Sequence, residues 1–118
     1  MTRSERDEER DERIEMEIVV DAYGREEQAM GWHVSLDDTL EFPFEARCRT
    51  EREESPLEEG ETVRVVGMSS TEPTLSQQFV TIKWMDRTLG APLEQLEPVD
   101  VGSATEQAIA DWQYWLER

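Results

Sequence analysis

The stretch Gly31–Phe44, GWHVSLDDTLEFPF, marks the change from helix to strand that decides how this chain folds. Trp32, Leu36 and Leu40 recur at four-residue steps, which is the spacing of one helix face. Pro43 then forbids continuation of the helix, because its ring removes a backbone donor and clashes with the preceding turn. We therefore expect a helix that ends close to residue 38 and a strand that begins immediately after residue 43.

The residues before this boundary predict two helices, from about Asp11 to Ala22 and from about Arg25 to Asp38. Gly24 supplies the stop between them. The segment Arg3–Arg13 carries only charged or polar residues. It is typical either of a frayed tail or of an exposed first helical turn.

The residues after the boundary predict short strands. Alternation begins at Phe44, and a second alternating strand follows Gly60. Residues 79–84 and 88–92 predict a hairpin around residues 85–87, followed by a short helical turn and a last strand over 92–99. Together these strands favour a small SH3-like β-barrel.

The chain closes with a predicted helix over residues 104–117, preceded by Ser103-Ala104-Thr105-Glu106 in the pattern of a capping box. The fold class is thus α+β, a small SH3-like barrel flanked by two N-terminal helices and one C-terminal helix. We expect a charged tail over residues 1–12 and a single domain over 13–118, with helices in 13–40 and the barrel in 44–100.

The charge of the chain limits its partners. Its 118 residues include 29 acidic and 12 basic residues, so the formal net charge is -17. Such a field repels nucleic-acid phosphates and anionic lipid head groups, so neither nucleic acid nor membrane is an expected partner. Adaptation to high salt accounts for the acidity equally well, since Arg occurs 11 times and Lys once.

Enzymatic chemistry is not indicated. Cys48 and His33 are the only residues of their types, which excludes an internal disulfide and a cysteine zinc site. Both are interpreted as packing residues, because no nucleophile–base–acid group is evident around them. The N-terminus lacks a secretory h-region and no apolar run could span a bilayer, so we expect a cytoplasmic protein.

The acids at the end of the second helix are the candidate site. Asp37 and Asp38 stand where the helix dipole disfavours negative charge, and Glu41 follows just before the proline. Calcium takes six to eight oxygen ligands from carboxylates, carbonyls and water, so these three side chains are candidate calcium ligands. The alternative is a solvated helix end in which an aspartate pairs with Arg25 or Arg47.

Several stretches in the same order resemble the CcbP-type calcium-binding proteins, a small acidic family without EF-hands. The matching stretches are residues 13–23, 28–32, 36–47, 55–57, 65–68, 91–97 and 108–115. The resemblance implies calcium binding, with Asp37 and Asp38 on the family's acid pair, and a role as a cytoplasmic calcium buffer or signalling protein.

The chain departs from the family pattern at three places. The loop 69–78 contains only Glu72 as an acid, residues 102–104 are Gly-Ser-Ala, and residues 33–35 are His-Val-Ser. These departures weaken the case for a second calcium site in those regions. The hypothesis from another class is an SH3-like protein-interaction module whose acidity reflects high-salt adaptation.

Overall fold

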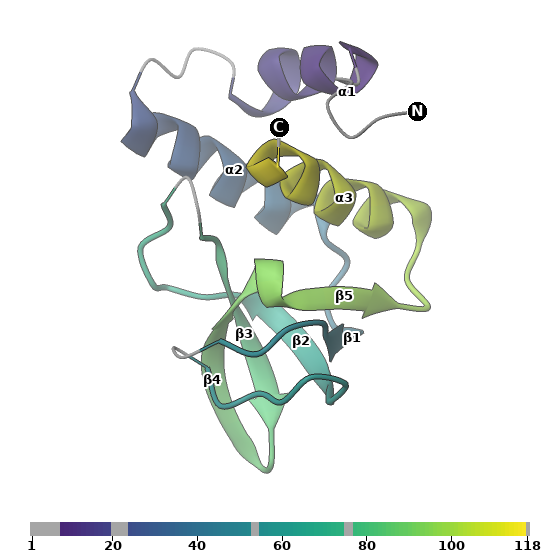
Figure 1. The fold of residues 1–118 in the computed structure, drawn as a ribbon. Helices are drawn as coiled ribbons and strands as arrows, with labels where there is room; N and C mark the ends of the chain where they lie inside the picture. The colour runs from purple at the N-terminus through teal and green to yellow at the C-terminus, as the bar shows by residue number, and fades with distance from the viewer. Residues whose placement is uncertain (1–7, 20–23, 53–54, 75–76, 118) are drawn as a thin grey trace.

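The computed structural model describes residues 8–19, 24–52, 55–74 and 77–117. A layer of helices covers one end of a five-stranded antiparallel sheet, and the N-terminal helix lies on the side of this layer away from the sheet (Figure 1). The elements, in chain order, are α1 Glu8–Arg13, the π-helical turn η1 Ile14–Ile18, α2 Arg25–Thr39, β1 Phe44–Cys48, β2 Thr62–Met68, β3 Phe79–Trp84, β4 Arg87–Pro92, the 3-10 turn η2 Leu93–Gln95, β5 Leu96–Val99 and α3 Ser103–Glu117. The α+β class is therefore confirmed.

The sheet has the strand order β4-β3-β2-β1-β5. Each pairing is antiparallel, and the ladder between β2 and β3 shifts register between Val65 and Gly67. The predicted closed barrel is wrong: β4 pairs with β3 and β5 pairs with β1, but β4 and β5 form no ladder among the described residues. The three-residue η2 turn joins these two outer strands, so the sheet must curl to bring the end of β4 near the start of β5, but the strands then diverge without pairing.

The predicted hairpin is confirmed, with a tighter turn than expected. Only Met85 and Asp86 form the loop between β3 and β4, and both have positive φ angles, 48° and 64°. Two consecutive positive φ values are typical of a type I′ turn, whose twist matches that of the flanking strands. Arg87 is therefore the first residue of β4 rather than part of the turn.

The helix α2 positions the core. Its face Ala29, Trp32 and Leu36 is buried, as the four-residue spacing predicts, and Leu40 continues that face beyond the last turn. The helix ends one residue later than expected, at Thr39, and Leu40 takes extended backbone angles. The Trp32 ring meets Trp112 of α3 edge-on, with 5.0 Å between ring centroids.

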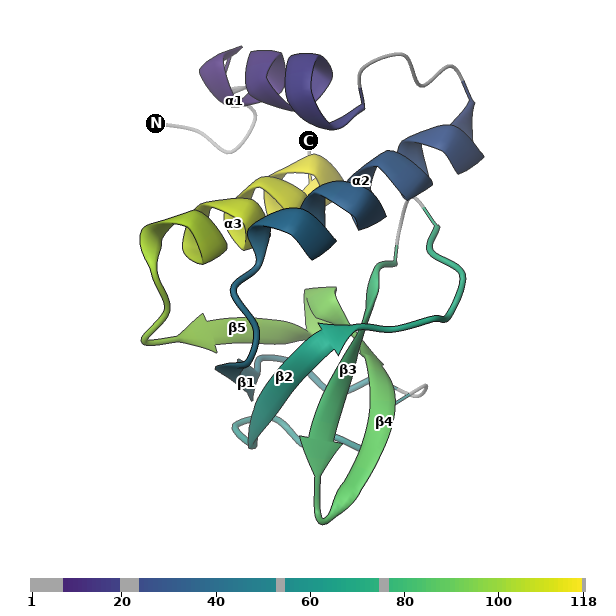
Figure 2. The same ribbon diagram turned by 180° about the vertical axis from the view of Figure 1, so that it is seen from behind.

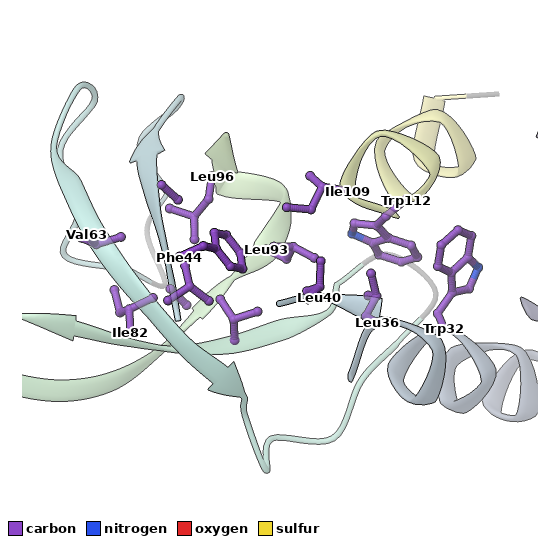
Figure 3. Packing of buried hydrophobic residues seen from close by; sticks show 14 of the residues in the cluster. Trp32, Leu36, Leu40, Phe44, Val63, Ile82, Leu93, Leu96, Ile109 and Trp112 are labelled. Atoms are coloured by element: carbon purple, nitrogen blue, oxygen red, sulfur yellow. The ribbon is translucent and has the colours of Figure 1, made fainter. Parts of the chain in front are cut away.

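This aromatic contact joins the two helices above the sheet. Figure 3 shows Leu36, Leu40, Leu93 and Ile109 between the tryptophan pair and the strands. Burying these side chains contributes on the order of 1.5–3 kcal/mol each. One continuous core therefore connects the helical layer to the sheet, and α2 and β1 cannot separate without opening it.

The N-terminal segment packs on α2 and α3 (Figure 2). Arg13 donates two hydrogen bonds to the buried carboxylate of Asp111, at 3.2 and 2.7 Å, and Arg10 pairs with the same carboxylate. The predicted helix over 11–22 begins earlier, at Glu8, and continues as the turn η1 to Ile18, with Val19 as its C-cap. Its predicted last residues, 20–22, lie outside the described residues.

A buried carboxyl lies under the helices. Glu94 of η2 is 5% exposed; its Oε1 accepts hydrogen bonds from the Gln78 backbone N–H and from Trp112 Nε1–H, at 2.9 and 2.8 Å. Its Oε2 has no hydrogen-bond partner among the described residues. Desolvation therefore raises the pKa of Glu94, and the two hydrogen bonds offset only part of that effect.

No helix among the described residues is both long enough and apolar enough to cross a bilayer.

The C-terminal helix begins at Ser103, one residue before the predicted start. The Gly102 carbonyl accepts the Glu106 N–H at 3.0 Å.

Replacing Gly31 with alanine should loosen the N-terminal segment. A Cβ at this position would stand 2.5 Å from the Ile18 carbonyl oxygen, so the backbones would have to move apart. Such overpacking costs about 1–3 kcal/mol, against about 1 kcal/mol gained from helix propensity. We expect faster hydrogen exchange at the Val19 N–H, which bonds to the Ile14 carbonyl.

The matched control is Gly67→Ala, where a Cβ would meet open space. Unchanged exchange at Val19 in the Gly31→Ala variant would show that the segment does not depend on this close approach.

Replacing Glu94 with glutamine should remove a pH dependence of stability. Because the folded pKa is raised above 4.5, the folded state binds this proton more tightly than the unfolded state does. The stability that the neutral carboxyl contributes is present below pH 4.5 and is lost as the pH rises through the folded pKa. The slope cannot exceed about 1.4 kcal/mol per pH unit for one proton.

As the pH rises through this window, we expect the free energy of unfolding of Glu94→Gln to increase relative to that of the parent protein. This relative gain should persist at higher pH. Urea unfolding at a series of pH values measures the difference, with the exposed Glu72→Gln as the control. A difference independent of pH would contradict a raised pKa for the buried Glu94.

Candidate calcium site

The candidate acids lie where α2 ends. Asp37 and Asp38 are exposed on its last turn, and Glu41 is exposed two residues beyond Thr39. Their exposure follows from the helix period, since Leu36 and Leu40 occupy the buried face and the residues between them must point outward. The last carbonyls of the helix lie beside these side chains and are further oxygen donors.

The structure does not bring all three carboxylates into one cavity. Asp38 lines an open groove between α2, α3 and the N-terminal segment, whereas Glu41 lines a separate hollow beside β1 and β5. Asp37 lines neither. Among the described residues, no group of three or more His, Cys, Asp or Glu side chains is arranged closely enough to hold a metal ion as it stands.

Two acids that the sequence did not single out share the hollow of Glu41. Glu45 of β1 and Asp100, which follows β5, line it together with Glu41, and its volume is about 390 Å³. The β1–β5 ladder explains their proximity, because Glu45 pairs with Val99, the neighbour of Asp100. Arg64 also lines the hollow and is opposite Glu45 on β2, so three carboxylates stand against one guanidinium.

Backbone contacts hold Glu41 in place. Its N–H donates to the hydroxyl of the buried Thr105 at 3.0 Å, which fixes the chain between α2 and β1 against the start of α3. A Cβ at Gly102 would lie 2.9 Å from Glu41 Oε1, so the carboxylate rests directly against this glycine. The Gly-Ser-Ala stretch therefore leaves room for the Glu41 side chain, although it brings no acid of its own.

Asp100 adopts a left-handed backbone, with φ of 52°. Aspartate tolerates this conformation better than most residues, because its short side chain can hydrogen-bond locally. The turn ends β5 and places Asp100 in the lining shared with Glu41. The sequence does show that Asp100 follows the last predicted strand. It does not show that Asp100 lies beside Glu45, because that contact depends on strand pairing.

The other residues considered for chemistry are structural. Cys48 is 1% exposed, and its Sγ donates to the Thr50 carbonyl at 3.1 Å. His33 is half-buried on α2. Both placements agree with the packing roles expected from the sequence.

Comparisons with known proteins agree with one another. A family model named for CcbP and described as "Calcium binding" matches residues 12–116. The crystal structure of Anabaena CcbP is 44% identical, with a TM-score of 0.86, and the match covers 100% of this chain and 97% of that one. A structure described as a calcium-binding protein in the calcium-binding form is 43% identical, with a TM-score of 0.83 over 98% and 95% of the two chains. No curated protein matches.

Proposed function

Because this chain belongs to the CcbP family of calcium-binding proteins, we propose that it binds calcium through the carboxylates that surround the end of α2, namely Asp37, Asp38 and Glu41. The observation that carries the proposal is the hollow that Glu41 shares with Glu45 and Asp100. Glu41 and Glu45 come from the stretch that leads into β1, and Asp100 comes from the distant segment after β5. Their mutual repulsion in the absence of a cation is relieved when one enters.

The chemistry suits a hard divalent cation. Calcium accepts carboxylate oxygens in irregular geometry and completes its coordination with water. All of the predicted ligands are exposed, so an ion bound there would keep much of its hydration. We therefore propose modest affinity, weakened further by salt, because surface charges are screened over about 10 Å at 0.1 M ionic strength.

Because Asp38 lines the groove and Glu41 lines the separate hollow, the acids have different proposed roles. Glu41 is fixed by Thr105 and Gly102 and lies beside two further carboxylates, so it is the proposed anchor of the ion. Asp37 and Asp38 lie on the preceding helical turn. In the proposal they supply long-range attraction and reach the ion through water molecules.

The biological role that fits such a site is buffering of free calcium in the cytoplasm. A surface site whose ion keeps much of its hydration exchanges that ion rapidly and holds it weakly. The SH3-like interaction module is less well supported, because that reading required exposed aromatic residues in a barrel groove. The sheet is open, and the exposed large apolar residues described are Met16, Met30, Val34 and Met85, none of them aromatic.

Calcium titration by calorimetry tests the proposal. In 0.1 M NaCl we expect heat of binding with the parent protein and about tenfold weaker binding by Glu41→Gln, corresponding to about 1.4 kcal/mol. Asp38→Asn should weaken binding by a smaller factor, since its charge acts at longer range. The matched controls are Glu72→Gln and Asp86→Asn, whose carboxylates are exposed elsewhere.

Equal losses in the control variants would show that general surface charge binds the ion. Unchanged binding by both Glu41→Gln and Asp38→Asn would place the site elsewhere in the chain.

Calcium should also stabilise the fold, because a ligand that binds only the folded state raises the free energy of unfolding by about 2.7 kcal/mol at one hundred times its dissociation constant. Thermal unfolding with and without calcium, at equal ionic strength set by NaCl, measures this effect. A midpoint that responds only to ionic strength would indicate screening rather than binding.

A further inference from the structure

The groove that Asp38 borders is distinct from the hollow of Glu41. It has a volume of about 630 Å³ and lies between α2, α3 and the N-terminal segment. Figure 2 shows these three helical segments together on the side of the molecule away from the sheet. The groove therefore belongs wholly to the helical layer.

One wall of the groove is an apolar stripe on α2. Met30 and Val34 are four residues apart, so they stand one above the other on a single helix face, and Asp38 follows after another four. Met30 is 47% exposed and Val34 is 55% exposed, although both are large apolar side chains. The buried face of the same helix, represented by Trp32 and Leu36, meets the core, whereas Met30 and Val34 do not belong to the core cluster.

The remaining walls make the groove receptive to an apolar side chain. Ile18 lines it from the N-terminal segment, and Ala104 and Ala108 line it from α3. The small side chains leave space where a bulky residue would fill the gap between the helices. Methionine adapts its shape to different partners, which makes Met30 suited to a docking surface.

The borders of the groove carry unbalanced negative charge. Glu17 and Asp38 line it and are exposed. Arg13 lines it as well, but its guanidinium bonds to the buried Asp111. Ile18, next to Glu17, contacts α2 at Gly31. At 1.5 Å per residue, Gly31 and Asp38 are about 11 Å apart along the helix, so the two carboxylates are near opposite ends of the stripe.

We propose that this groove binds a basic amphipathic helix of another protein, with apolar side chains of that helix against Met30 and Val34 and its Lys or Arg residues beside Glu17 and Asp38. The rise from Gly31 to Asp38 corresponds to about seven residues of an α-helix, or two turns, so a docked helix of that length spans the stripe and can reach both borders. This is the helix-in-groove mode of recognition, read through anchors at three- and four-residue steps. The proposal goes beyond calcium binding and does not require it.

Charge selects this occupant over the others. A second copy of the chain would bring another net charge of -17 to an already acidic surface, which opposes association. An apolar ligand without charge would leave the two border carboxylates uncompensated. A basic helix matches both the stripe and its borders.

The probe is a synthetic 14-residue peptide of leucine and lysine, with leucines placed on one helical face, and the reference is a scrambled peptide of the same composition. Both are titrated into the full chain in EDTA and 0.15 M NaCl, with amide chemical shifts and calorimetry as readouts. We expect the amphipathic peptide to bind at least about tenfold more tightly than the scrambled one, with shifts concentrated at Gly31, Val34, Ser35 and Ala108. The use of EDTA separates this result from the calcium proposal.

Val34→Glu is the decisive variant, because it adds negative charge while it removes an apolar anchor. Docking in the groove predicts weaker binding by about tenfold, whereas general electrostatic attraction predicts equal or tighter binding. Met85→Glu adds the same charge at an exposed residue of the β3–β4 turn and should not weaken binding. Amide spectra of both variants without peptide verify that they are folded.

Five results would overturn the proposal, of which the first four concern the peptide, the groove and self-association. These four are equal binding of the scrambled peptide, binding undiminished by Val34→Glu, shifts centred outside the groove, and self-association of the free protein that Val34→Glu abolishes. A change at residues 1–7 in the peptide-free Val34→Glu spectrum would assign the groove to the chain's own N-terminus and would also overturn it.

Discussion

The packing of one face of α2 against α3 and the sheet determines where every other feature of this molecule lies. Trp32 meets Trp112, and Leu36 and Leu40 continue the contact down to the strands. The same chain must then enter β1 at Phe44, within four residues of Leu40. A helix fixed by its buried face has no freedom to rotate, so Asp37 and Asp38 point to solvent and Glu41 lies in the connection between the layers.

The excess of acid is compatible with this core because most acids in the described part of the chain are exposed. Among the described residues, two carboxyls are buried, and each has specific compensation. Asp111 is paired with two arginines from the N-terminal segment, which makes it a tether, whereas Glu94 accepts two hydrogen bonds and has a raised pKa. An unpaired buried charge would cost several kcal/mol, which explains why the other described acids are exposed or half-buried, where repulsion is weaker and cations have access.

Local chemistry made much of this architecture predictable. The four-residue apolar steps gave the face of α2, Pro43 gave its limit, and alternation from Phe44 gave β1. The barrel prediction failed because closure depends on whether the outer strands pair, and no local pattern encodes that. The close approach of Ile18 to Gly31 is likewise a tertiary contact that no local pattern encodes.

The candidate site shows the same division. Asp37, Asp38 and Glu41 were recognisable because they lie together in the sequence at a helix end. Glu45 follows Glu41 by four residues but was interpreted only as part of a strand, and Asp100 becomes its neighbour only through the β1–β5 ladder. The sequence grouped acids that follow one another at the end of α2. The fold instead groups Glu41 and Glu45 with Asp100, a residue far away in the sequence.

The most direct test of calcium binding at the end of α2 is a calcium titration followed by backbone amide chemical shifts. If the carboxylates around Glu41 hold the ion, saturable shifts will be concentrated at residues 37–45 and 99–102, and the signals of Glu72 and Asp86 will respond only to ionic strength. Shifts spread evenly over the exposed acids, or centred away from Glu41 and Asp100, would contradict it.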